Sequence, residues 1–194
     1  MSALAGQPLG EVIEALAAPS PAPGGGSSAA LACALAAGLA EMTAAIAGAS
    51  ADPAGAERLD EHRSRAGELR GRVLELADRE LSSYRPVLEA IREAPGPAER
   101  DPRVGEALAA ASGPPLEIAQ AAAEVSAIGL GVAERTSPSV HGDVITSVLL
   151  AEAAARSAAA LVEANLRQRP GDERVAAARS AAEQAASARR RVLE

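Results

Sequence analysis

The segment best suited to bind a ligand is residues 19–28, which read Pro-Ser-Pro-Ala-Pro-Gly-Gly-Gly-Ser-Ser. The alternating prolines hold the backbone extended, because each fixes its own φ and keeps the preceding residue out of the helical region. The three glycines that follow, residues 24–26, put no side chain between the backbone and a ligand. Ser27 or Ser28 then suits the N-cap of a helix, whose first amides and dipole favour negative charge. The segment therefore suits an anionic or planar polar ligand, and the alternative is a plain connector before a helix.

Two familiar nucleotide motifs do not account for this segment. Residues 24–29, Gly-Gly-Gly-Ser-Ser-Ala, fit the dinucleotide pattern G-x-G-x-x-A, but the proline-rich residues before them cannot form the central strand that the motif must follow. A phosphate-binding Walker loop needs a lysine, and the chain contains none. Metal binding is equally unsupported, because the chain has no H-E-x-x-H motif and no cluster of cysteine and histidine. His62 lies in a charged run and is expected on a solvated helix face.

The elements that must position this segment are helices. Alanine and leucine dominate, valine and isoleucine are sparse, and no stretch alternates as a strand does, so the sequence predicts an all-α protein. Asp52-Pro53, Asp101-Pro102 and Asp172 mark helix starts. Short connections between the helices predict an antiparallel bundle, with residues 1–194 as one domain. The expected helices are 9–16, 28–48, 53–94, 102–112, 115–135, 143–167 and 173–191, and the break between 102–112 and 115–135 is alternatively a kink in one long helix.

Composition predicts an oligomer and restricts the class of partner. Hydrophobic residues make up 48% of the chain, yet there is no Phe, no Trp and one Tyr, so most of the apolar content is alanine. Alanine buries little area per residue, and a hydrophobic core gains about 25 cal/mol per Å² buried. We therefore expect a homo-oligomer whose interface completes the core. The net charge of −7 and the shortage of aromatic rings argue against nucleic acid binding.

The sequence also predicts a soluble, cytoplasmic protein. The lone cysteine, Cys33, rules out an internal disulfide framework and is compatible with a reducing compartment. The N-terminal residues carry no basic region of the kind that begins a secretory signal. The apolar run Ala29–Ala40 is too short to span a bilayer, so no membrane partner is expected.

Four parts of the chain together resemble the cyclodeaminase/cyclohydrolase family, which includes the C-terminal half of formiminotransferase-cyclodeaminase and free-standing methenyltetrahydrofolate cyclohydrolases. The first is the P-x-P-G-G-G-S segment ending at Ser27. The others are the acidic-x-x-x-aromatic-x-x-V pattern of residues 80–87, the Pro-Leu helix start of residues 115–119 and the long helix of residues 142–166. The family usually has aspartate at the place of Glu80, asparagine and serine at those of Ser139 and Gly142, and asparagine at that of Leu161.

The resemblance implies a fold, a substrate and two reactions. It implies the helix bundle of the formiminotransferase-cyclodeaminase C-terminal type, as a homodimer, acting on a one-carbon-substituted tetrahydrofolate. The enzyme would hydrolyse 5,10-methenyltetrahydrofolate to 10-formyltetrahydrofolate, or cyclise and deaminate 5-formiminotetrahydrofolate. Hydrolysis is the first expectation, because no formiminotransferase is attached to this chain. No metal or redox cofactor is needed. The alternative is a catalytically inactive folate-binding or scaffold protein of the same fold.

Both reactions need a group that moves protons and a negative charge beside a cationic carbon-nitrogen unit. Glu80 is the first candidate, since a partly buried carboxylate with a raised pKa can do both. Ser83 and Tyr84 follow it by three and four positions and share its helix face. The alternative for Glu80 is an exposed glutamate paired with Arg79 or another arginine.

Asp143 is the second catalytic candidate. It is expected at the N-cap of the long helix, with Thr146 and Ser147 on the same face, and capping alone would explain it. His141 can titrate near neutrality and is assigned to substrate binding. A Ser-His-Asp arrangement with Ser139 is present in the sequence, but no nucleophile elbow accompanies it.

The remaining candidates concern substrate binding. Asn165 lies 22 residues beyond Asp143, about 33 Å along a helix, so one folate reaches both only if the site is shared across a dimer; otherwise Asn165 is structural. Tyr84 is the only aromatic platform for a pterin, and unidentified arginines would hold the glutamate tail. The backbone of the glycine segment would face the pterin or the tail; its residues are Pro23, Gly24, Gly25, Gly26 and Ser27.

Overall fold

A computed structural model describes residues 4–98 and 101–194, and every regular element in these residues is a helix. This agrees with the predicted all-α class. The elements in chain order are η1 (Leu4–Gly6), α1 (Leu9–Ala17), α2 (Gly25–Gly48), α3 (Pro53–Ser83), α4 (Arg85–Glu93), α5 (Pro102–Ala110), α6 (Gly113–Ala133), α7 (His141–Asn165) and α8 (Glu173–Val192).

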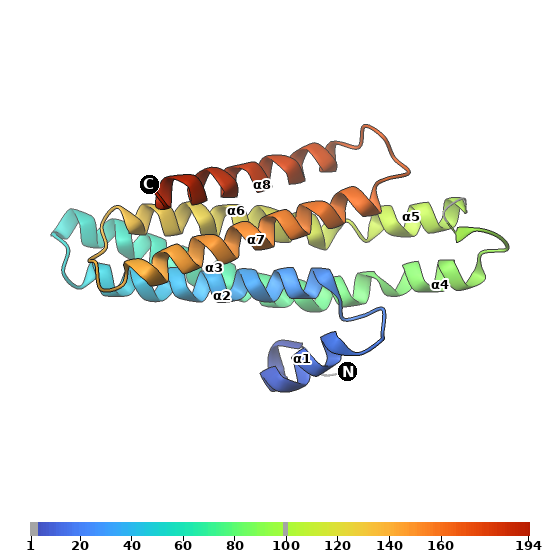
Figure 1. Cartoon of the computed structure of the whole chain (residues 1–194), viewed down its shortest axis with the longest axis horizontal. Helices are drawn as coiled ribbons and strands as arrows, with labels where there is room; N and C mark the ends of the chain where they lie inside the picture. The colour runs from blue at the N-terminus through green and yellow to red at the C-terminus, as the bar shows by residue number, and fades with distance from the viewer. Residues whose placement is uncertain (1–3, 99–100) are drawn as a thin grey trace.

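Four long helices form the body of the molecule. α2, α3, α6 and α7 lie side by side with successive members antiparallel, and α8 packs along α6 and α7 (Figure 1). α4 and α5 extend together beyond one end of the bundle, while α1 lies outside it on the side of α2 (Figure 1). The helix starts were predicted correctly at three aspartates. Asp52, Asp101 and Asp172 each accept a hydrogen bond from a backbone amide in the first turn that follows, at 2.7, 2.9 and 3.1 Å.

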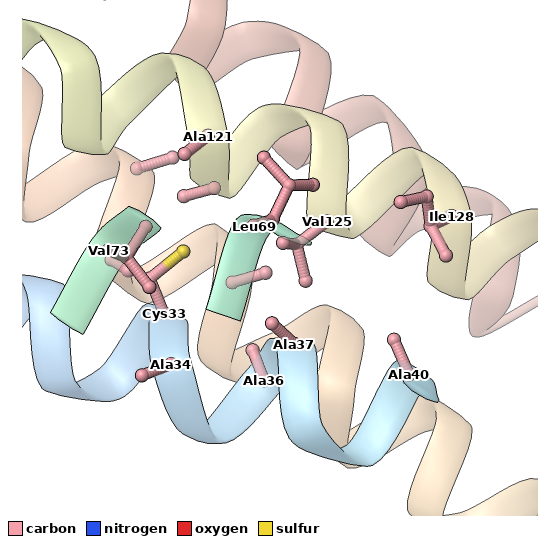
Figure 2. Packing of buried hydrophobic residues seen from close by; sticks show 14 of the residues in the cluster. Cys33, Ala34, Ala36, Ala37, Ala40, Leu69, Val73, Ala121, Val125 and Ile128 are labelled. Atoms are coloured by element: carbon pink, nitrogen blue, oxygen red, sulfur yellow. The ribbon is translucent and has the colours of Figure 1, made fainter. Parts of the chain in front are cut away.

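The core is built mainly from alanine. Along its inner face α2 contributes Cys33 and a series of alanines, which meet larger side chains from α3 and α6 such as Leu69, Val73 and Ile128 (Figure 2). Burial raises the pKa of the Cys33 thiol to about 12, so this residue behaves as a small apolar side chain. Small residues allow the backbones to approach closely, and the Ser147 hydroxyl of α7 donates a hydrogen bond of 2.8 Å to the Ala36 carbonyl of α2.

The sequence analysis predicted that His62 lies on a solvated helix face, but in the structure its side chain is partly buried. Its imidazole lies over Gly131 of α6, where a Cβ on the glycine would stand only 2.7 Å from Nε2. The side chain is partly buried between α3 and α6. The missing side chain of Gly131 therefore makes room for the ring.

Two predicted helix starts were wrong. α2 begins at Gly25, with Gly24 at the N-cap, instead of near Ser28; the glycines join the helix and Ser27 turns inward to α3. α7 begins at His141, with Val140 at the N-cap, so Asp143 lies inside the first turn and is not the capping residue. The positive end of the helix dipole still stabilises an acidic side chain at that position.

Prolines explain two further differences from prediction. The helix expected to run to residue 94 is interrupted at Tyr84, between α3 and α4. Pro86 lacks a backbone N–H and its ring crowds the carbonyl four residues earlier, which breaks a continuous helix. α6 begins at Gly113, before Pro114 and Pro115, because proline in a first turn loses no hydrogen bond.

Three stretches of the described chain have the length and apolar composition of a membrane span: α2, residues 102–133 and α7. The sequence analysis judged the apolar run Ala29–Ala40 too short to span a bilayer. The helix that contains this run, α2, has 24 residues and is long enough, so that judgement of length was wrong. In this fold about half of each stretch is buried within the bundle.

Candidate active site

Glu80 and the glycine segment meet where α2 begins. The Glu80 side chain occupies the space beside Gly26, and a Cβ on that glycine would overlap its carboxylate. The Ser27 hydroxyl donates a 3.1 Å hydrogen bond to Glu80 Oε2 and lies 3.3 Å from the Ala77 carbonyl. Gly26 and Ser27 are buried. The structure thus places a carboxylate of α3 against the first turn of α2.

The environment of Glu80 favours its neutral form. Burial raises the pKa of the Glu80 carboxyl above its usual range, and the hydrogen bonds from the hydroxyl and amide of Ser27 only partly oppose the shift. The alternative of an exposed glutamate paired with Arg79 is wrong: Arg79 Nη2 lies 2.9 Å from Glu117 Oε1 on α6. Within residues 4–98 and 101–194, Ser27 is the side chain that bonds Glu80.

The C-terminal end of α7 reaches the same place. A Cβ on Gly25 would stand 3.8 Å from both methyl groups of Leu161, so Leu161 provides an apolar wall beside the glycine segment. Asn165 lies one turn beyond Leu161, at the last position of α7, and is partly exposed. Leu161 was not among the predicted binding residues, although the sequence analysis noted it as a position where the family usually has asparagine.

Tyr84 and Pro23 belong to this end of the molecule too. Tyr84 ends α3, and its backbone amide donates a 3.3 Å hydrogen bond to the Glu80 carbonyl. Ser83, also predicted on the Glu80 face, donates through its hydroxyl to the same carbonyl at 2.9 Å. Pro23 and Gly24 precede α2 and are partly buried. The predicted binding residues Pro23, Gly24, Gly25, Gly26, Ser27, Tyr84 and Asn165 therefore gather at one end with Glu80.

Asp143 and His141 lie towards the other end of the same chain. Both are exposed in the first turn of α7, and Asp143 is 18 residues before Leu161, about 27 Å along the helix. Thr146 and Ser147 do not serve Asp143, because their hydroxyls bond the Gly142 and Ala36 carbonyls. The two predicted catalytic carboxylates are not together within one chain.

The Ser-His-Asp arrangement receives no support from the loop before α7. The hydroxyls of Ser139 and Ser137 lie 2.8 Å apart in a hydrogen bond, and both residues are exposed. Among the described residues no three His, Cys, Asp or Glu side chains group as they would around a metal ion. A groove of about 820 Å³ lies between α7 and α8, where its lining includes Arg167 and Arg169, and is separate from Glu80.

The chain is thus an all-helical bundle in which the partly buried carboxylate of Glu80 lies against the first turn of α2, a helix rich in small residues. The sequence profile of the formiminotransferase-cyclodeaminase family matches residues 8–184, and this chain belongs to that family. The crystal structure of formiminotetrahydrofolate cyclodeaminase from Thermotoga maritima superposes with a TM-score of 0.84, over 97% of this chain and 95% of that one. At 19% identity this similarity establishes the fold. No curated protein matches the chain.

Proposed function

We propose that this chain is an enzyme of folate one-carbon chemistry. Its substrate would be 5,10-methenyltetrahydrofolate, hydrolysed to 10-formyltetrahydrofolate, or 5-formiminotetrahydrofolate, cyclised with loss of ammonia. Family membership supports the substrate class. The observation that carries the proposal is the Glu80 carboxylate, which is held by Ser27 against Gly26 and has a raised pKa.

Both reactions need the proton transfers that such a carboxylate performs. In hydrolysis a water oxygen bonds to the amidinium carbon while a base takes its proton; one carbon-nitrogen bond then breaks as that nitrogen is protonated. In deamination N10, the amine nitrogen outside the pterin ring, bonds to the formimino carbon and gives up its proton, and the formimino nitrogen takes up protons and leaves as ammonia. Burial raises the pKa of Glu80, which makes its carboxylate a stronger base than that of an exposed glutamate, and the ionised form complements the cationic carbon.

In this proposal the first turn of α2 binds the substrate. Gly25 is exposed and Gly24 is partly buried, and neither carries a side chain of its own, so this part of the backbone can face a planar polar ring or an anionic tail, while Gly26 is buried against Glu80. Leu161 gives an apolar wall on one side, and Tyr84 and Asn165 lie at the same end. The proposed reactions need neither a metal nor a redox cofactor, since both involve only bond exchange and proton transfer. We also propose a cytoplasmic location, as the sequence analysis predicted.

The proposal also keeps the homodimer with a shared site. Asp143 and His141 lie too far from Glu80 in one chain to act on the same folate, so a second copy must supply them if they take part. The alternative remains an inactive protein of the same fold that binds folate. This alternative is favoured by the position of Asp143, which is exposed and far from Glu80 in one chain.

Two assays on the purified protein test the function. Loss of the methenyltetrahydrofolate absorbance reports hydrolysis, and ammonia release from 5-formiminotetrahydrofolate reports deamination. Glu80→Gln should abolish whichever activity is present, while Glu75→Gln, on an exposed part of α3, should leave it unchanged. Saturable folate binding without turnover of either substrate would support the inactive alternative, and full turnover by Glu80→Gln would remove Glu80 from the mechanism.

A further inference from the structure

The face of α3 that carries Glu80 continues onto α4, beyond the point where α2 begins (Figure 1). The Tyr84 amide donates a 3.3 Å hydrogen bond to the Glu80 carbonyl, and the Leu88 amide donates one of 3.2 Å to the Tyr84 carbonyl. The four-residue spacing of an α-helix is therefore kept across the break at Tyr84. Glu80, Tyr84 and Leu88 consequently form one row along the helix surface.

The row ends on a cation. Arg92 follows Leu88 by four positions and lies 12 residues beyond Glu80, a rise of about 18 Å along the helix. Tyr84 and Leu88 are partly exposed, and Ile91, next to the row, is 42% exposed. Read from Glu80 outward, the row presents a carboxylate, an aromatic ring, an aliphatic surface and a guanidinium.

The guanidinium at the end of the row has no internal counter-ion. In residues 4–98 and 101–194 no carboxylate lies within ion-pair distance of Arg92 or of Arg85, which precedes it by seven positions on the same side of α4; Glu89, between them in sequence, pairs with neither. By contrast, Arg79 lies 2.9 Å from Glu117 of α6. Arg85 and Arg92 can therefore bind a carboxylate supplied by a ligand.

We propose that the face of α4 formed by Tyr84, Leu88 and Ile91 binds the aminobenzoyl ring of the folate substrate, and that Arg92, with Arg85 beside it, binds the carboxylates of the glutamate tail. In a folate the one-carbon unit is followed by the aminobenzoyl ring, an amide and the glutamate. The row that starts at Glu80 presents the complementary groups in the same order. The inference rests on the proposed function, because it assigns the parts of that substrate to parts of the site.

This assignment also orients the pterin. The one-carbon unit lies between the pterin and the aminobenzoyl ring, so an aminobenzoyl ring on α4 puts the pterin on the other side of Glu80. There the backbone of Gly25 and the methyl groups of Leu161 form the opposite wall of the site. Tyr84 then contacts the aminobenzoyl ring, in the offset or edge-to-face arrangement that aromatic pairs prefer, whereas the sequence analysis assigned it to the pterin.

An apolar protein surface fits this face less well. It would cover Leu88 and Ile91 but leave the guanidinium of Arg92 without a partner at the edge of a dry interface, which costs free energy. A ligand with an aromatic ring followed by carboxylates satisfies both features. The face is also continuous with Glu80, so one extended molecule reaches both.

Steady-state kinetics test the tail assignment. Arg92→Gln should raise KM for the folate that the chain turns over by at least about tenfold, the effect of a lost hydrogen bond between charged groups. The kcat should stay within about twofold, because the tail is bound equally in the ground state and the transition state. With an analogue in which an unsubstituted amide replaces the glutamate, the Arg92→Gln and unchanged chains should have the same KM.

The matched control is Arg58→Gln. Arg58 is another exposed arginine without an ion pair in the described chain, and it lies near the opposite end of α3. Its substitution should leave KM unchanged for both compounds. An equal KM for the glutamate-bearing substrate in Arg92→Gln and Arg58→Gln would overturn the tail assignment and leave the proposed function standing.

Binding of p-aminobenzoyl-glutamate, the aryl half of a folate, tests the face without any turnover. Titration calorimetry should detect saturable binding to the unchanged chain, weakened at least about tenfold in Arg92→Gln and weakened also in Ile91→Gln, whose exposed position leaves the fold intact. The ligand should slow hydrogen exchange of α4 amides, and p-aminobenzamide, which lacks the carboxylates, should bind the Arg92→Gln and unchanged chains equally.

The two tests separate the inference from the proposed function. Unaltered exchange in α4 at saturating p-aminobenzoyl-glutamate, or affinity that does not depend on Arg92, would overturn the inference. A chain that binds this compound as expected but turns over neither folate would refute the proposed enzyme and keep the α4 face as a binding site for the aryl half of a folate.

Discussion

In two places α3 fills the space of a missing side chain on a neighbouring helix with a titratable group. Near its C-terminal end Glu80 lies against Gly26 of α2, and in its first half His62 lies over Gly131 of α6. The packing device is the same in both. The glycine lets two helices approach while one of them still carries a large polar side chain between them.

The two places differ in what surrounds the polar group. Glu80 meets the first turn of α2, where Ser27 hydrogen-bonds it and where the helix dipole favours negative charge. His62 meets the last turns of α6, near the carbonyl end of that helix. A glycine contact therefore suits substrate chemistry when it lies at a helix N-terminus that also offers donors, and serves packing elsewhere.

The largest expected effect is on turnover, which should distinguish Glu80 from His62. Glu80→Gln should lower turnover by about 10²- to 10⁴-fold, the range of a lost acid-base group, because the amide cannot exchange protons. His62→Gln should stay within about twofold of the unchanged chain. Steady-state rates on the folate that the chain turns over measure both, and equal losses in the two variants would erase the distinction.

Substituting the glycines should give the next largest effect. Gly26→Ala must displace the Glu80 carboxylate from Ser27, so we expect turnover to fall at least about tenfold, while the free energy of unfolding changes by roughly 1–3 kcal/mol. Gly131→Ala only pushes the partly exposed His62 ring outward, and the gain in helix propensity of about 1 kcal/mol offsets part of the cost.

Gly71→Ala is the matched control for both glycine substitutions. It lies on α3 with no atom within 4 Å of the added Cβ, so it should stabilise by up to about 1 kcal/mol without loss of activity. Urea denaturation and turnover of the three variants provide the comparison. A Gly26→Ala protein with normal turnover would show that the carboxylate position does not matter.

The raised pKa of Glu80 predicts a pH dependence of stability. A carboxyl whose pKa is higher in the folded state binds its proton more tightly there, so its contribution to stability is complete below its unfolded pKa of about 4.3 and is lost as the pH rises through the folded value. The free energy of unfolding of the unchanged chain should therefore fall relative to that of Glu80→Gln as the pH rises from about 4 through the folded-state pKa. A difference that is constant with pH would contradict the shift.

The smallest expected effect concerns Ser27. The Ser27 hydroxyl lowers the pKa of Glu80 against the larger effect of burial, so Ser27→Ala should raise that pKa further and move the acid limb of the pH-rate profile to higher pH. Ser28→Ala is the control, because its hydroxyl bonds the Gly24 carbonyl on the exposed side. A shift of equal size in both variants would exclude a specific role for the bond.

Local signals in the sequence were enough for most of the helices. Asp52, Asp101 and Asp172 act through their own first turns, so the residues that decide these caps are adjacent in sequence. The break at Tyr84 was not predicted: the sequence analysis expected one helix over residues 53–94, although Pro86 cannot donate the backbone hydrogen bond that a continuous helix needs there.

The site depended on contacts that no local pattern contains. The bond between Ser27 and Glu80 joins residues 53 positions apart, and it requires the register of α2 against α3. Family resemblance named both residues, but only the fold shows that Ser27 faces α3 and does not cap its own helix. The position of Asp143 near the opposite end of the bundle followed from helix length, which the sequence did predict.

The helix breaks at Tyr84 and at residues 111–112 define a part of the protein that we expect to unfold locally, before the rest of the chain. Both lie at the same end of the bundle, and the α4–α5 pair between them packs on itself more than on the four core helices (Figure 1). One tie to the rest is the 2.6 Å hydrogen bond from Arg174 of α8 to the Ala109 carbonyl. Amide hydrogen exchange should therefore release this pair as a separate cooperative unit, while the amides of α2 and α3 stay protected until the whole chain unfolds.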